Sequence, residues 1–516
     1  MKAIRWASDR LRKEGVVAFV TNSGFLDGIA TDGMRKNLAA DFDEIYVLDL
    51  GGNVRKNPKL SGTTHNVFGI QVGVSINIFV RRDTPIEKRK CKILYANVDE
   101  FWTRGRKEIF LSEAHSLNGV DWTPLTPDDK NNWLTDQLRP EFYGFQQITN
   151  IFDKQSRGVA TSRDAWVYNN SPDQLTKNIK KSIAFYNKEQ DRLARAELPI
   201  DLDYFVEYDE NQISWSRDLK EDLQRGKRGE FNKAKVRNSL YRPYSRTFVF
   251  FDRVFNEEVY VFPSIVPTPE TERENCLIAL TGAGSEKPFM ILASRTLVDL
   301  HLVGAGCSTQ CFPFYVYDED GTNRQENITD QPLAQFRTHY GQQSISKWDI
   351  FHYTYALLHH HEYRTRYAAN LKRELPRIPY APAFQKFAEI GAALMKLHIE
   401  YEQQSEYPLE RQETGKLNWR VEKMSLSKDK AQLKYNDFLT LSGIPLEVYE
   451  YRLGNRSALE WIIDQYQIST DKRSGITNDP NREDDPEYIV RLIGQVITVS
   501  LETVRLVREL STLALQ

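Results

Sequence analysis

The sequence predicts an α/β sheet in the first quarter of the chain, followed by an α+β region whose C-terminal half is largely helical. Apolar strands alternate with a short helical stretch before residue 100. Short aromatic and β-branched runs separated by turn residues are typical of residues 150 to 320, and long amphipathic stripes follow. A chain of 516 residues, 40% of them hydrophobic, is long enough for two or more domains.

The N-terminal region has the pattern of an incomplete sheet. Residues 15–26, GVVAFVTNSGFL, form a continuous apolar run that ends in polar residues, which predicts a strand buried on both faces and leading to a functional loop. We expect a helix at 33–40 and strands at 44–50, 72–82 and 92–98. A doubly wound sheet normally has more strands than these before its second half.

The rest of the chain divides at a polar, proline-containing linker over residues 111–150. Two late helices carry start signals: Pro382 stands in the first turn of one, and Asp485 is the expected cap of the other. Asn455 is the expected cap of the helix that carries Trp461.

Charge and cysteine content limit the class of protein. The net charge of −2 means that a polyanion would be bound by local clusters of lysine and arginine and not by a general positive field. Four cysteines in so long a chain fit a reducing compartment. No run approaches the roughly 18 apolar residues of a membrane span. We therefore expect a cytoplasmic protein.

The loop between Gly51 and Gly62 is rich in glycine, amides and cations. No Gly-Lys-Ser/Thr follows its glycines, so it is not a phosphate-binding P-loop. Cations anchor a nucleic-acid backbone and amides read base edges, so this loop is a candidate DNA contact; the alternative is a solvated loop without function. Its candidate residues are Arg55, Lys56 and Lys59, with Asn53, Asn57 and Asn66.

Further candidate DNA contacts lie in five other stretches, residues 156–166, 232–253, 428–438, 451–466 and 469–475. Cations interleaved with tyrosines suit phosphate neutralisation and stacking, although a cationic face on a structural sheet has the same composition. Those expected to contact the backbone are Arg157, Arg163, Arg237, Arg242 and Arg246. Weaker candidates, for either backbone or bases, are Lys434, Asn436, Arg456, Lys472 and Arg473.

No catalytic, cofactor or metal residue is assigned from the sequence. His359, His360 and His361 are adjacent, and adjacent residues of a helix point 100° apart, so a half-buried or surface cluster is expected. His301, Cys307 and Cys311 lack the second Cys-x-x-Cys pair typical of zinc sites. No Gly-x-Ser-x-Gly elbow is present.

Long blocks of the chain resemble, in order, the C-terminal portion of type ISP restriction-modification enzymes. The blocks include VLDLGGNVRKNPKLSGTTHNVFGIQVGVSINIFVRR, DLHLVGAGCSTQCFP and LGNRSALEWIIDQYQISTDKRSGITNDPN. These bacterial single-chain enzymes join a nuclease, an ATP-driven translocase, an adenine-specific DNA methyltransferase and a target recognition domain. The resemblance implies sequence-specific recognition of double-stranded DNA within a restriction-modification system.

The same resemblance implies which methyltransferase parts are missing. Family members hold the extruded adenine with an Asn/Asp-Pro-Pro-Tyr/Phe tetrapeptide and S-adenosylmethionine with a glycine-containing loop, and neither is found here. Residues 1–125 are then the distal part of a doubly wound methyltransferase sheet, 140–325 the strand-rich part of the target recognition domain, and 326–516 its helical part. Such a chain is expected to be inactive alone and to need S-adenosylmethionine only in the complete methyltransferase.

Three alternatives follow for the chain as a whole. It acts with a separate chain that carries the proximal methyltransferase half, it is an inert truncated remnant, or it is a self-sufficient enzyme with an unrecognised site.

Overall fold

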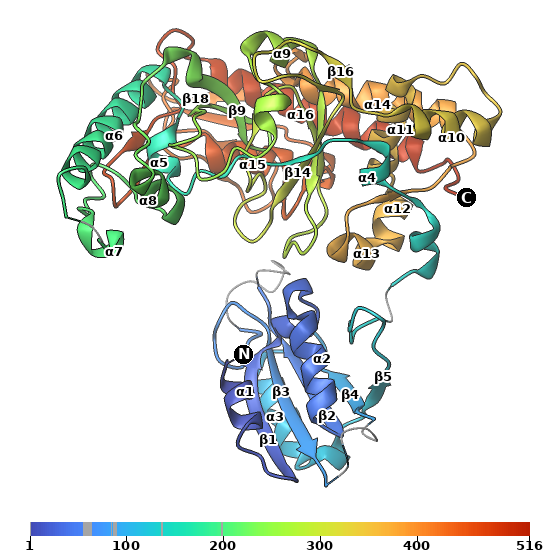
Figure 1. The fold of residues 1–516 in the computed structure, drawn as a ribbon. Coiled ribbons are helices and arrows are strands. Elements are labelled where there is room, and N and C mark those ends of the chain that lie inside the picture. Colours follow the sequence, from blue (N-terminus) through green and yellow to red (C-terminus); the bar gives the residue numbers. More distant parts are fainter. Residues whose placement is uncertain (1, 55–63, 84, 86–89, 136–137, 198–199) are drawn as a thin grey trace. The chain divides into compact units, whose positions relative to one another are not determined.

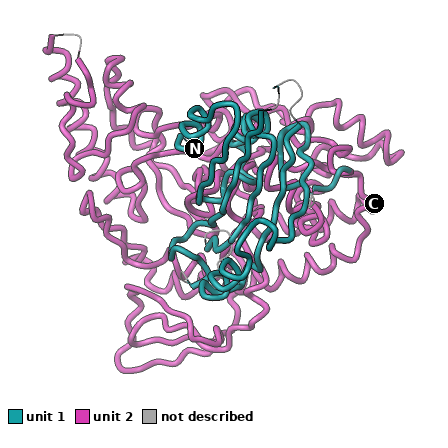
Figure 2. Tube along the Cα trace, turned by 90° about the horizontal axis from the view of Figure 1, so that it is seen from below, with its two compact units in different colours: residues 1–140 teal, residues 141–516 magenta. Residues whose placement is uncertain are grey.

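The computed structural model describes residues 2–54, 64–83, 85, 90–135, 138–197 and 200–516. They divide into two compact units, Met1–Pro140 and Glu141–Gln516, which Figure 2 colours separately. No helix in these ranges is long and apolar enough to cross a membrane.

Unit 1 is built on a five-stranded mixed sheet (Figure 1). The strand order is β1 (Gly15–Asn22), β3 (Val74–Arg81), β2 (Glu44–Gly51), β4 (Lys92–Asn97), β5 (Thr123–Leu125). β3 runs antiparallel to both of its neighbours, and β2 pairs with β4 in parallel. The expected strands at 44–50, 72–82 and 92–98 are confirmed, and the expected helix at 33–40 is α2 (Asp32–Asp41).

Helices cover the two faces of this sheet unequally. On one face α1 (Lys2–Ser8) and α2 bury Ile4 and Leu38 against Val17 of β1 and Phe79 of β3. On the other face α3 (Arg104–Ala114) packs its apolar side chains over β2 and β4. The small cluster under α3 contains no residue of β1.

The prediction that β1 is buried on both faces is wrong. Val17 is buried, but Val16 and Val20 on the opposite face are 61% and 51% exposed. Within the described residues β1 is an edge strand, and α3 does not reach the face on which these valines lie. An apolar run therefore marked a strand of which only one face is buried in this structure.

Unit 2 is organised around one continuous hydrophobic core that runs from Phe142 to Leu515. Its first sheet has the order β13 (Leu297–Val298), β9 (Val236–Arg242), β10 (Ser245–Phe250), β8 (Tyr168–Asn169). Its second has the order β12 (Ile291–Ser294), β11 (Leu277–Thr281), β14 (Thr309–Pro313), β7 (Ser156–Arg157). The long helices are α6 (Pro172–Leu193), α10 (Asp330–Tyr340), α11 (Lys347–His359), α14 (Phe384–Ile399) and α16 (Tyr488–Leu510).

Shorter elements complete unit 2. The short helices are α4 (Ile148–Ile151), α5 (Asp164–Val167), α7 (Leu202–Phe205), α8 (Arg217–Gln224), α9 (Pro269–Glu274), α12 (His361–Arg366), α13 (Ala368–Arg373) and α15 (Ala458–Gln465). Two-stranded ladders join β6 (Gln146–Gln147) to β17 (Arg377–Ile378) and β15 (Tyr315–Val316) to β16 (Gln325–Glu326).

The C-terminal half is less helical than the sequence predicted. Between α14 and α16 the chain forms a third sheet and two hairpins, where short strands of mixed polarity gave no helical or alternating pattern. The sheet order is β18 (Glu410–Glu413), β21 (Leu439–Ser442), β20 (Gln432–Lys434), β19 (Ser425–Leu426). The hairpins are β22 (Arg452–Leu453) with β23 (Arg456–Ser457), and β24 (Ser469–Thr470) with β25 (Thr477–Asn478).

Three expected helix-start signals are wrong. Pro382 precedes Ala383, the N-cap of α14 (Phe384–Ile399), and so lies outside the first turn. Ser457, not Asn455, caps α15, because its hydroxyl accepts the Glu460 N–H while the Glu460 carboxylate accepts the Ser457 N–H. At α16 the N-cap position is occupied by Glu487, and the Asp485 carboxylate is paired with Arg491 instead. At α15 the hydroxyl of Ser457 takes the capping role expected of Asn455. At α16 the guanidinium of Arg491 binds the carboxylate of Asp485.

Candidate functional site

The predicted DNA-contacting residues fall into three groups in the structure. Arg55, Lys56 and Lys59 lie outside the described residues. A second group is buried and bonded to other parts of the protein, and a third is exposed. In the same N-terminal loop, Asn66 is buried and uses its amide to bind Val72 O at 2.7 Å and the Phe68 N–H at 2.9 Å.

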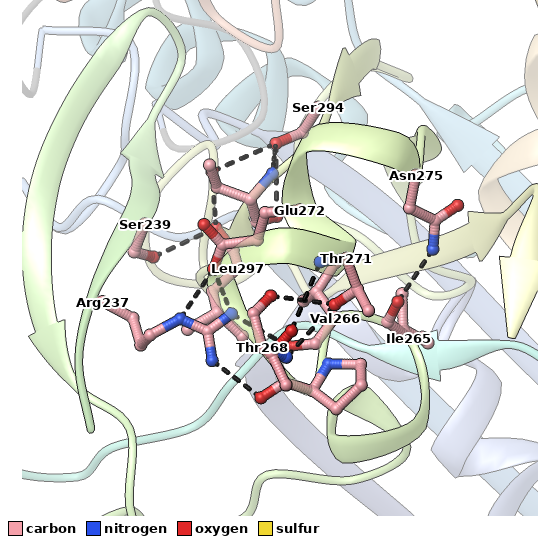
Figure 3. Close-up of polar contacts among 12 residues, drawn as sticks. Arg237, Ser239, Ile265, Val266, Thr268, Thr271, Glu272, Asn275, Ser294 and Leu297 are labelled. Atoms are coloured by element: carbon pink, nitrogen blue, oxygen red, sulfur yellow. Dashed lines mark hydrogen bonds and ion pairs between the residues drawn. The ribbon is translucent and has the colours of Figure 1, made fainter. Parts of the chain in front are cut away.

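Arg237 is held by an internal ion pair (Figure 3). Its Nε donates to Glu272 Oε1 at 2.9 Å, and its two Nη atoms donate to the carbonyl oxygens of Val266 and Pro267. Burial raises the pKa of Glu272 above its usual value, while the adjacent Arg237 acts in the opposite direction. Four of the five N–H groups of this guanidinium therefore donate to the protein itself.

Arg163 is fully buried, with 0% of its side chain exposed. It donates to Phe255 O at 2.7 Å, to Ser216 Oγ at 2.6 Å and to Ser214 O at 3.2 Å. Burial lowers the pKa of Arg163 to about 10. The residue therefore ties the start of α5 to the segments before α8 and after β10.

Arg242 and Arg246, at the two ends of the β9–β10 turn, also have partners. Arg242 pairs with Asp299 at 2.8 Å and lies 3.9 Å from the centre of the Tyr241 ring. Burial raises the pKa of Asp299 to about 6, with Arg242 acting against it. Arg246 is half-buried and pairs with Glu402 at 3.1 Å.

Three of the weaker candidates have local partners. Asn436 closes a turn, since its Nδ2 donates to Asn418 O at 2.6 Å and its Oδ1 accepts the Leu439 N–H at 2.9 Å. Lys434 is exposed and pairs with Asp437 at 2.7 Å, and Arg456 is half-buried and pairs with Asp464 at 3.1 Å.

Arg157, Lys472 and Arg473 are exposed, and their side chains enter no ion pair within the described ranges. Lys472 and Arg473 lie in the turn between β24 and β25, here called the hairpin turn (residues 471–476). Asp471 Oδ1 accepts the N–H of Ser474 at 2.8 Å and that of Arg473 at 3.2 Å, and these bonds lower the pKa of Asp471. The two cations therefore project from an internally braced turn.

Next to the hairpin turn lies a cleft of about 400 Å³ that the sequence did not reveal. Its walls come from three separate stretches: α5 with β8, the β9–β10 hairpin, and the segment from the end of α15 to β25. We call it the amide cleft, because its lining includes Asn169, Asn170, Gln465, Gln467 and Asn478. The sequence signal, isolated amides in NNS and DQYQ, is too common to distinguish without the fold.

The histidines and cysteines form no recognisable centre. His359 and His360 are buried, and burial lowers the pKa of His359 to about 3. His301 Nδ1 contacts the carbonyl oxygen of Cys307 at 2.9 Å and not its thiol. Among the described residues, no three His, Cys, Asp or Glu side chains gather as a metal site would require.

Known structures are similar to this chain over nearly all of its length. A nuclease-deletion mutant of the Type ISP restriction-modification enzyme LlaGI, in complex with a DNA substrate mimic, is 33% identical over 98% of this chain with a TM-score of 0.88. DrdV in complex with DNA is 36% identical over 98% with a TM-score of 0.87. The ATP-dependent Type ISP restriction-modification enzyme LlaBIII bound to DNA is 31% identical over 100% with a TM-score of 0.89.

This chain spans 40%, 51% and 34% of the length of those three chains, in the same order. No curated protein matches it. The sequence model of the Type ISP C-terminal specificity domain matches residues 150–492, which make up most of unit 2. The chain therefore belongs to the family of Type ISP C-terminal specificity domains.

Proposed function

We propose that unit 2 recognises a double-stranded DNA target for a restriction-modification system. The observation that carries the proposal is the family match over residues 150–492, supported by three similar structures of enzymes in complex with DNA or a DNA substrate mimic. The net charge of −2 gives no general attraction to DNA, so exposed local cations must supply the contacts.

The exposed cations are the proposed backbone contacts. Lys472 and Arg473 on the hairpin turn, together with Arg157, have no internal carboxylate partner in the described ranges and so need not break an ion pair to bind phosphate. Lys434 and Arg456 remain proposed contacts that would exchange Asp437 and Asp464 for phosphate. Arg163, Arg237 and Arg242 are proposed instead to hold the fold, because breaking a buried pair leaves an uncompensated charge.

We further propose that unit 1 is the distal part of a methyltransferase sheet. Its supports are the antiparallel β3 between β1 and β2, and the uncovered outer face of β1. Strands and a helix outside the described residues would continue the sheet beyond β1 and cover Val16 and Val20. A separate chain carrying the proximal half is one proposed source of these elements.

The turn after β1 in unit 1 does not fit S-adenosylmethionine. The turn after β1 is filled from within: a Cβ on Gly28 would meet Gly24 O at 2.7 Å, and Arg35 Nη1 donates to Phe25 O and Gly28 O at 2.8 Å. We therefore assign no step of methyl transfer to this chain. We propose that the proximal half of the methyltransferase binds the methyl donor.

Titration of the chain with labelled random-sequence duplexes at several salt concentrations tests the proposal. A specificity domain should bind with log Kd linear in log salt, with a slope of about 0.9 per phosphate neutralised. No binding even at about 50 mM salt would contradict the proposed function.

A further inference from the structure

The amide cleft offers hydrogen-bonding groups that the fold does not use. In the described part of the chain, the Asn170 side chain makes no hydrogen bond, although its N–H donates to Asn478 Oδ1 at 2.8 Å. Gln467 uses its Nε2 on the carbonyl oxygen of Asp464 at 2.8 Å and leaves Oε1 for another donor. The cleft wall thus presents both amide donors and amide acceptors.

One hydroxyl in the cleft is buried without a partner. Thr247, on β10, is 5% exposed and lines the cleft, and its Oγ1 has no hydrogen-bond partner in the described part of the chain. Leaving a buried polar atom unpaired is unfavourable, so this hydroxyl is a polar group beneath the cleft wall that the described fold leaves unsatisfied.

The lining selects against phosphate. Among the described residues that line the cleft there is no lysine or arginine, and Asp164, Asp464 and Asp471 contribute carboxylates. Asp164 Oδ2 is already bonded to the Tyr241 hydroxyl at 2.9 Å, and the rings of Tyr241 and Tyr168 lie 4.7 Å apart. A neutral, planar, hydrogen-bonding group with an amino donor fits this chemistry better than an anion does.

Cations stand directly beside the cleft. The hairpin turn carries Lys472 and Arg473, while the strands on either side of it supply Ser469, Thr470 and Asn478 to the lining. Asn478 anchors β25 to the end of β8 through the Asn170 N–H, so the turn and the cleft wall form one continuous unit. A nucleic-acid strand held at the turn by its phosphates would therefore bring its bases to the cleft.

We propose that the amide cleft receives the edge of a nucleobase that carries an exocyclic amino group, adenine or cytosine, and that Asn170 and Gln467 help to set the DNA sequence preference. Amides pair with adenine at N6 and N7, and amide or carboxylate oxygens accept from cytosine N4. This inference rests on the proposed DNA recognition and adds which residues read bases.

The test selects preferred duplexes from a random pool with the full chain, and then repeats the selection with Asn170→Ala and Gln467→Ala. Each variant should lose preference at one or two positions occupied by adenine or cytosine. Its affinity for the duplex selected by the unmodified chain should fall roughly 5- to 150-fold, the range expected when a base-reading side chain is removed. Affinity for non-selected duplex should stay within about twofold, because phosphate contacts are intact.

Gln343→Ala is the matched control, because Gln343 is exposed in the loop between α10 and α11, away from the cleft lining. Near-ultraviolet circular dichroism of each variant establishes that it is folded. Gln467→Ala removes one side-chain hydrogen bond, the bond to Asp464 O, and should therefore leave the fold intact. The result with this variant decides the test even if Asn170→Ala disturbs β8.

The outcomes separate the two proposals. If the unmodified chain binds no duplex, the proposed function is wrong. If it binds and selects a sequence, but both cleft variants select the same sequence with the same affinity, the cleft inference alone is wrong. Titration with free adenosine and cytidine completes the test, since millimolar nucleoside binding that the cleft variants abolish, without any change in DNA selection, would assign the cleft to nucleosides and overturn the inference.

Discussion

Strand β1 of unit 1 and strand β11 of unit 2 differ in how completely they are buried. Unit 1 leaves Val16 and Val20 exposed on its edge strand, whereas every residue of β11 in unit 2 is buried. Both units bury charged groups and give them partners within the same unit, as Arg35 in unit 1 and Arg163 and Arg237 in unit 2 show. The difference teaches that strand β11 is buried on both faces by its own unit, while the edge strand of unit 1 leaves one apolar face exposed within the described residues.

The largest expected effect on stability is that of Arg237→Ala. The substitution leaves Glu272 buried without its cation, and removing one partner of a buried pair costs about 3 to 5 kcal/mol. Urea unfolding followed by circular dichroism measures this loss. Arg253→Ala is the matched control, because its ion pair with Glu319 is exposed on both sides and should contribute no measurable stability. Equal effects of the two substitutions would contradict the structural role of Arg237.

A pair of identical substitutions compares the two units directly. Val249→Thr buries a hydroxyl in the core of unit 2 and should destabilise it by about 1 to 3 kcal/mol. Val16→Thr in unit 1 should change stability little, because its hydroxyl stays in water. Urea unfolding of both variants checks the comparison, and a strong loss from Val16→Thr would show that this face is covered in solution.

Unit 2 should also lose stability in acid. Burial lowers the pKa of His359 to about 3 and that of His398 well below its usual value, so the native state disfavours protons that the unfolded chain binds below about pH 6.5. The contribution of these histidines to the free energy of unfolding is therefore fully present above about pH 6.5 and is lost as the pH falls toward about 3. The loss is at most about 1.4 kcal/mol per pH unit for each histidine. Urea unfolding from about pH 7.5 to about pH 5 should show this slope, and His359→Gln should flatten it. A slope unchanged in that variant would exclude His359 as a source.

The smallest effect on stability belongs to the hairpin turn. Lys472→Ala combined with Arg473→Ala should leave unfolding unchanged, because neither side chain has an ion-pair partner in the described ranges. The same double variant should weaken binding to all duplexes alike and lower the salt slope by about 1 for each phosphate that is no longer neutralised. An unchanged slope would exclude the hairpin turn as a backbone contact.

Local sequence patterns predicted strands and helices well where one physical rule dominated. The alternation and apolar content of 44–50 and 92–98 located β2 and β4, and the stripe of Phe387 and Leu394 located α14. The predicted caps of α15 and α16 failed, because Ser457 caps α15 in place of Asn455 and the Asp485 carboxylate pairs with Arg491.

Composition alone did not distinguish the arginines that are buried in internal ion pairs from those that are exposed to solvent. The stretch from residue 232 to 253 has the mix of cations and tyrosines that suits DNA, yet Arg237 and Arg242 find their carboxylates in Glu272 and Asp299, 35 and 57 residues further along the chain. The amide cleft was missed for the same reason, since its walls come from three distant stretches. Only the fold brings such partners together.

Hydrogen exchange of the full chain, with and without duplex DNA, measures most directly whether unit 2 is the part that reads DNA. The account predicts slower exchange of amides over residues 464–478 when DNA is bound, and unchanged exchange in β1, the edge strand of unit 1. Protection confined to unit 1, or no protection anywhere at a DNA concentration well above Kd, would contradict it.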